Sequence, residues 1–110
     1  MSFPVLEFDA NSLVGKERFH TTFAMALGFF NGYGRNMDAW IDCMSYLRAP
    51  EAGMTRFRVE EGETLTIVLR NYERFRDAAP EQGRDLIECA AAVNLGEIER
   101  GAAPLIALAF

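Results

Sequence analysis

The stretch YGRNMDAWIDCM, residues 33–44, contains a loop followed at once by an amphipathic helix. Asn36 is a residue type preferred just before a helix, because its side chain can accept a hydrogen bond from the first turn. Apolar side chains then recur at spacings of three and four, as in a helix with one buried face. The members of this face are Met37, Trp40, Ile41, Met44 and Leu47. The stretch therefore predicts a helix over residues 37–47 that packs on a core.

Two carboxylates lie on a different face of this predicted helix. Asp38 and Asp42 are four residues apart, so their side chains project from the same side and repel one another. Ser45 and Tyr46, not basic residues, stand three and four positions beyond Asp42. Two interpretations remain open. The acids are either a solvated helix start, which the helix dipole favours, or a surface held for a cationic partner.

Outside this segment, strand and helix patterns alternate along the chain. The predicted elements are, in order, strand 3–8, helix 15–28, helix 37–47, strands 55–59 and 63–69 around a turn at 60–62, a short helix from 71 interrupted by Pro80, helix 81–93 or beyond, and strand 105–110. This order predicts a single α/β domain over residues 1–110, with a parallel sheet and right-handed helical crossovers.

The composition is that of a globular protein with an acidic surface. Half of the 110 residues are hydrophobic, and the net charge is −5. Proteins that bind nucleic acids need concentrated positive charge, and this sequence has more acidic than basic residues. Direct nucleic-acid binding is therefore disfavoured. Acidity suits a basic protein partner, although it also serves simply to keep a protein soluble.

The chain is expected to be cytoplasmic. Its N-terminus lacks a basic region followed by a long apolar run, and no apolar run reaches the roughly 20 residues of a membrane helix. Cys43 and Cys89 lie within helical patterns, which predicts two buried free thiols in a reducing compartment. Neither membrane contact nor a disulfide framework is expected.

Residues 16–48 resemble the most distinctive part of the barstar family. The shared pattern is Tyr-Gly-x-Asn-x-Asp-Ala followed by a second Asp and a Cys, which here begins at Tyr33 and ends at Cys43. Tyr72 and Phe75 fit the start of a later family helix, and the closing strand fits as well. The resemblance implies a three-stranded parallel sheet with crossover helices, to which residues 55–59 would add an extra strand or hairpin.

The resemblance also implies a function. Barstar-like proteins are intracellular inhibitors that plug the active site of a basic, extracellular-type ribonuclease, with helix carboxylates in the place of substrate phosphate. A further acid on the last long helix would contribute, with Glu88 and Glu97 as candidates. No enzymatic activity, cofactor or metal is implied. The partner-binding residues would be Tyr33, Asn36, Asp38, Asp42 and Tyr46.

Several residues depart from the family's type member. Gly32 replaces a contacting Tyr, and Ile41 and Leu47 replace Trp. Tyr46 replaces a Gly on the contact face, where a bulky ring could clash with the usual enzyme or grip a different one. The alternative function is therefore a barstar-like interaction module with a non-nuclease partner.

Other chemistry in the sequence is weaker. His20 is the single histidine and is expected at the surface or partly packed, because no partner for it is evident. A nucleophilic pair with Cys43 is disfavoured, since Cys43 belongs to the helix motif. Phe29 and Phe30 form either a cluster packed under their loop, which is the favoured interpretation, or part of the interface. A small enzyme would require a pocket with converging polar groups away from the two aspartates.

Overall fold

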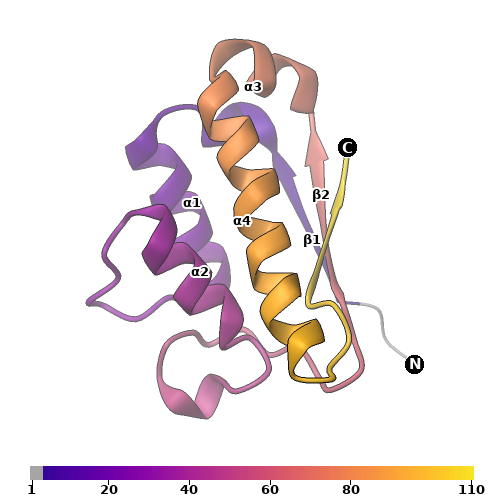
Figure 1. Cartoon of the computed structure of the whole chain (residues 1–110). Helices are drawn as coiled ribbons and strands as arrows, with labels where there is room; N and C mark the ends of the chain where they lie inside the picture. Colours follow the sequence, from indigo (N-terminus) through magenta and orange to yellow (C-terminus); the bar gives the residue numbers. More distant parts are fainter. Residues whose placement is uncertain (1–3) are drawn as a thin grey trace.

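The computed structural model describes residues 4–110 as three strands with helical connections (Figure 1). The predicted first strand began at Phe3, which lies outside the described residues. Two short 3-10 turns follow β1 and α2, at Ala10–Leu13 and Pro50–Ala52. The main elements are β1 (Val5–Asp9), α1 (Lys16–Leu27), α2 (Met37–Ser45), β2 (Leu65–Arg70), α3 (Tyr72–Ala78), α4 (Pro80–Glu99) and β3 (Ile106–Ala109).

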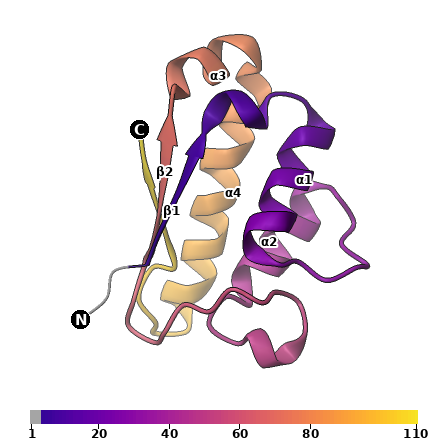
Figure 2. The ribbon, with the colours of Figure 1, turned by 180° about the vertical axis from the view of Figure 1, so that it is seen from behind.

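The sheet has the order β1-β2-β3 and both strand pairs are parallel, which confirms the predicted fold class. Helices α1, α2 and α4 lie to one side of this sheet (Figures 1 and 2). Alternate side chains of the central strand point into the core, because successive residues of a strand face opposite ways. On β2 these are Leu65, Ile67 and Leu69, all buried.

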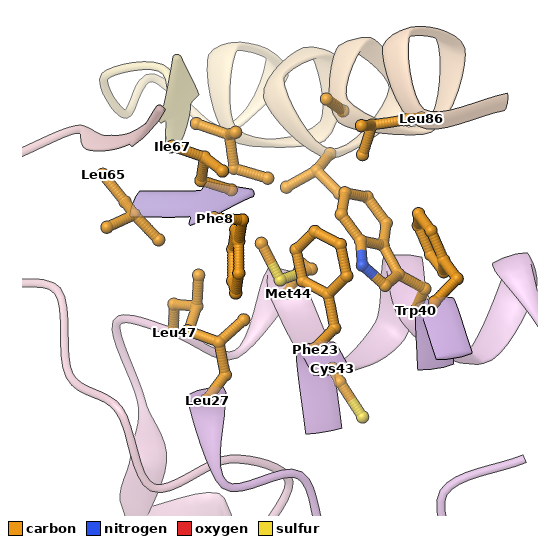
Figure 3. Close-up of a cluster of buried hydrophobic side chains, with 14 of the residues drawn as sticks. Phe8, Phe23, Leu27, Trp40, Cys43, Met44, Leu47, Leu65, Ile67 and Leu86 are labelled. Atoms are coloured by element: carbon orange, nitrogen blue, oxygen red, sulfur yellow. The ribbon is translucent and has the colours of Figure 1, made fainter. Parts of the chain in front are cut away.

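The core lies between the sheet and the helices, and α2 supplies its largest side chain. Trp40 is fully buried and stands edge-on to Phe23 of α1, with ring centroids 5.6 Å apart. In Figure 3, Leu86 of α4 and Cys43 of α2 lie on opposite sides of the Trp40 indole. Packing of the predicted inward stripe therefore fixes which side of α2 remains for solvent.

Residues 55–59 do not form the predicted strand, so the extra strand or hairpin is wrong. The backbone amides of this segment instead reach the carbonyls at helix ends. Arg56 and Phe57 donate to Leu27 at the end of α1, and Val59 donates to Leu47 just beyond α2. The backbone amides of the segment thus find their hydrogen-bond acceptors at the ends of two helices and not at an edge of the sheet.

The helix boundaries follow from local chemistry. Helix α1 ends at Gly28 as predicted, with φ 67°, and a side chain there would collide with Arg56, whose Cβ would be 2.7 Å away. Helix α4 was predicted over residues 81–93 or beyond, and it continues past Asn94 to Glu99. The Asn94 amide side chain accepts hydrogen bonds from Leu105 and Ile106 and donates one to Ile106, so it joins the helix to β3.

Within residues 4–110, no helix is both long enough and apolar enough to cross a membrane.

Candidate functional site

The start of α2 is built by the loop that precedes it. Arg35 has a left-handed backbone with φ 54°, and this turn directs the chain into the helix. Asn36 is extended, and its Oδ1 accepts a hydrogen bond of 2.8 Å from the amide of Ala39. Asn36 is therefore the N-cap that the sequence predicted, and it holds the first helical turn, which carries Asp38, in place.

Asp38 and Asp42 are exposed on the same side of α2. In the described part of the chain, neither carboxylate forms an ion pair. The carboxylate of Asp42 is close enough to Cys43 to act with burial in raising the pKa of that thiol to about 11. Two unpaired anions one turn apart thus face solvent, next to the positive end of the helix dipole.

Arg35 is the cation nearest in sequence, yet it turns away from both aspartates. Its guanidinium donates to the carboxylate and the carbonyl oxygen of Glu17, at 3.0 Å each, and to the hydroxyl of Thr21 at 2.7 Å. All three acceptors belong to α1. The loop cation is therefore held on the neighbouring helix and leaves the charge of the α2 face uncompensated.

Tyr33 belongs to the loop that precedes α2 and is buried. Its Oη is 2.6 Å from Nδ1 of His20, and its ring packs on Phe29. His20 is buried as well, which corrects the expectation of a surface or partly packed histidine. Burial, together with the charges of Arg35 and Lys16, lowers the pKa of His20. Nδ1 of a neutral imidazole can then accept a hydrogen bond from the Tyr33 hydroxyl, so the pair anchors the loop to α1.

Tyr46 stands at the other end of α2, immediately after its last residue, with 42% of its surface exposed. It lies beside a groove of about 830 Å³ between the end of α2 and the turn that connects α4 to β3. Arg48, Glu97 and Arg100 also line this groove. Ser45 lines it too, but the Ser45 hydroxyl is used in a bond to the carbonyl of Ile41.

The two candidate acids of α4 occupy very different environments. The side chain of Glu97 is only 5% exposed and pairs with Arg48 at 3.5 Å and Arg100 at 2.6 Å, so it has little charge to offer a partner. Glu88 is exposed. Together with Asp85 and Asp38 it adds to the effect of burial in raising the pKa of Cys89. The anionic side of α4 therefore lies beside Asp38, in the first half of the helix.

Nucleophilic chemistry has little support at this site. Cys43 is buried with a raised pKa, so its thiol stays protonated near neutral pH. Nδ1 of His20 is engaged by Tyr33 rather than by a sulfur. Cys89 is a free, half-buried thiol beside carboxylates, which disfavour a thiolate. Of the two expected buried thiols, only Cys43 is fully buried.

Sequence reasoning missed Arg48 and the groove beside Tyr46. Arg48 donates hydrogen bonds to the carbonyls of Glu63, Ala103 and Pro104, and it pairs with Glu97, which lies 49 positions away. No local pattern encodes partners at that distance. The only signal was an arginine just past the end of an amphipathic helix.

What the face can do chemically is to receive cations. Carboxylates bind guanidinium and ammonium groups through short, charge-assisted hydrogen bonds. Asp38 and Asp42 offer four acceptor oxygens, and the exposed Tyr46 ring adds a surface on which an apolar or cationic group can pack. Among residues 4–110, no group of three or more metal-binding side chains is assembled.

Comparison with known protein families finds a match over most of the chain. The family model described as Barstar (barnase inhibitor) matches residues 3–105. No curated protein matches the chain significantly. Proteins of this family are inhibitors that bind barnase-like ribonucleases as protein partners, and they are not enzymes. Since the match spans nearly the whole sequence, the chain belongs to the barstar family.

Proposed function

We propose that this protein inhibits a basic, extracellular-type ribonuclease, acting in the cytoplasm of the cell that makes the enzyme. The observation that carries the proposal is the pair of exposed carboxylates, Asp38 and Asp42, which have no ion pair within the described chain. A ribonuclease site holds cationic side chains to receive phosphate. Two carboxylates one helical turn apart imitate that anion and fill the site.

The rest of the face has supporting roles in this proposal. Asn36 fixes the helix start, and Tyr33 holds the loop through its bond to His20. Tyr46 lies at the rim, where its ring selects among enzymes by shape. The net charge of −5 speeds the encounter with a basic enzyme, an effect for which barnase and barstar are the standard example.

The test is inhibition of barnase, used as the probe enzyme, by Asp38→Asn and Asp42→Asn. Both variants keep size and shape but remove one charge each. Loss of one partner from a desolvated charge pair costs about 2–5 kcal/mol, so we expect the inhibition constant to rise roughly 30-fold or more. Glu73→Gln is the matched control, because Glu73 is an exposed acid on α3 without an ion pair in residues 4–110.

Salt dependence separates this mechanism from simple obstruction of the enzyme. The association rate should fall steeply with added salt, and the fall should be shallower for the double variant Asp38→Asn/Asp42→Asn. Inhibition that is equally strong for both aspartate variants and for Glu73→Gln would refute the acidic-face mechanism.

A second candidate is an interaction module whose partner is not a nuclease, and the exposed ring of Tyr46 favours it. This candidate predicts that Tyr46→Gly gains inhibition of barnase, because removing the ring removes the obstacle. A captured non-nuclease protein whose binding is lost in Asp42→Asn, with barnase unaffected by the wild-type chain, would establish it over the first.

A further inference from the structure

Helix α4 carries an apolar stripe on the side opposite its core contacts. Ile87, Leu95 and Ile98 are 43%, 58% and 53% exposed, and Ala91 is exposed between them. Spacings of four, four and three place all four side chains in one line along the helix. Single exposed apolar residues are common on proteins, but an aligned series is typical of a helix–helix contact.

The stripe faces solvent in the described structure. Leu86, Ala90 and Val93 occupy the buried side of the same helix and face the core. In Figure 1, α4 lies at the front of the molecule, with α2 on one side and β3 on the other, and no element crosses in front of it. About half of the surface of Ile87, Leu95 and Ile98 therefore remains exposed among residues 4–110.

The charges that flank the stripe are complementary to those of a second copy. Arg84 lies seven residues before Ala91, and Glu99 lies eight residues after it. At about 1.5 Å per residue, the two charges are nearly equidistant from the middle of the stripe, at about 11 and 12 Å. Two antiparallel α4 helices related by a two-fold axis near Ala91 would bring each Arg84 opposite the other copy's Glu99.

Both charges are available for this contact. Within the described residues, neither Arg84 nor Glu99 forms an ion pair. The small side chain of Ala91 at the centre permits close approach of the helices, and antiparallel alignment sets the helix dipoles favourably.

We propose that this protein forms a two-fold symmetric dimer through antiparallel contact of the α4 stripe. The occupant of the stripe is a second copy, because a two-fold contact is self-complementary and pairs Arg84 with Glu99 twice. Few large side chains are covered, so the dimer is weak and forms in the micromolar range or above. The α2 aspartates lie outside the contact. On the proposed function, one dimer would therefore hold two enzymes.

Sedimentation velocity of the isolated protein, from about 5 to about 500 µM, tests the dimer without any nuclease. The wild type should shift from monomer to dimer mass over this range. Leu95→Glu should remain monomeric throughout. Met25→Glu is the matched control, because Met25 is an exposed apolar residue on α1, and this variant should dimerise like the wild type.

A charge exchange tests the pairing itself. Arg84→Glu and Glu99→Arg should each weaken the dimer at least about threefold, and the double exchange should restore it. Glu99→Arg is the sharper single change: it lowers the net negative charge, so unspecific repulsion would predict stronger association.

Several results would overturn the dimer. One is a wild-type protein that stays monomeric at every concentration. Another is a Leu95→Glu variant that associates as strongly as the wild type, and a third is an assembly that grows beyond two copies. Loss of barnase binding by Leu95→Glu in a monomeric protein would also overturn it, since the stripe would then serve the enzyme. Asp42→Asn should still dimerise, so failure of the inhibitor mechanism and failure of the dimer are distinguishable.

Discussion

At the scale of single residues, the hydrogen bond between His20 and Tyr33 connects the fold to the proposed site. The two side chains come from α1 and from the loop before α2, and both are buried. Burial raises the pKa of the Tyr33 hydroxyl and lowers that of the His20 imidazole, so both groups stay neutral near pH 7. The loop that aims Asp38 at solvent therefore depends on an uncharged histidine.

Acid should weaken the folded state through His20. The ordinary pKa of 6.5 applies to the unfolded chain, and the folded value is lower, so the unfolded state binds the proton first. The contribution of His20 to stability is complete above pH 6.5 and is lost as the pH falls below that value towards the folded pKa. The free energy of unfolding, measured with urea, should fall less between pH 7.5 and pH 5.5 for His20→Gln than for the wild type.

Because His20 is the single histidine, its ring gives one NMR titration curve in the folded protein. A folded-state pKa at or above 6.5 would contradict this prediction. Tyr33→Phe, which leaves the ring packing but removes the hydroxyl, should shift the same curve.

At the scale of elements, α2 shows how a cap positions a functional face. The helix has nine residues, from Met37 to Ser45, and a helix this short depends on its cap and its packing. Asn36 supplies the cap through Ala39, while Trp40 and Met44 anchor the inner side. The carboxylates on the outer side are then held by the cap at one end of the helix and by side chains that pack in the core.

Removal of the cap should destabilise the protein. Asn36→Ala is expected to lower the free energy of unfolding by about 1 kcal/mol, since the Ala39 amide loses its acceptor, whereas Asn36→Ser should restore most of the loss. Urea unfolding monitored by Trp40 fluorescence measures the change. Asn31→Ala is the control, because Asn31 is exposed in the same loop and has no side-chain hydrogen bond in the described structure. Equal stabilities of the two alanine variants would exclude a capping role.

At the scale of the whole molecule, the buried ion pair between Arg48 and Glu97 connects distant parts of the chain near the groove beside Tyr46. The Arg48 side chain is 11% exposed and that of Glu97 5% exposed. Arg48 follows α2 and also binds the carbonyls of Ala103 and Pro104 on the approach to β3. One guanidinium thus joins α2, α4 and the start of β3.

Breaking this pair should be costly. Glu97→Gln leaves Arg48 buried without its carboxylate, and we expect a loss of about 3 kcal/mol in the free energy of unfolding. Arg100→Gln removes only the exposed partner of Glu97, so its effect should stay below about 1 kcal/mol. Comparable losses in the two variants, measured by urea unfolding, would mean that burial of the Arg48 pair does not determine its contribution.

The parallel sheet, the order of helices and the start of α2 could be predicted from the sequence. Alternation and three-four spacings are local patterns, and the N-cap at Asn36 acts across three residues. The strand predicted at 55–59 was wrong because the hydrogen-bond partners of this segment are not local. Its amides were equally able to pair with a sheet or with helix ends, and only the position of Leu27 and Leu47 in the fold decided between them.

The sequence by itself determined that Asp38 and Asp42 share one side of a capped helix, because the geometry of a helix converts a spacing of four into a common direction. It did not determine that Arg35 is held by α1, that Tyr33 is buried against His20, or that Glu97 is neutralised by Arg48. Those outcomes depend on residues far apart in the chain. Ionic and hydrogen-bonding partners are chosen by proximity in the folded state, and tertiary packing alone sets that proximity.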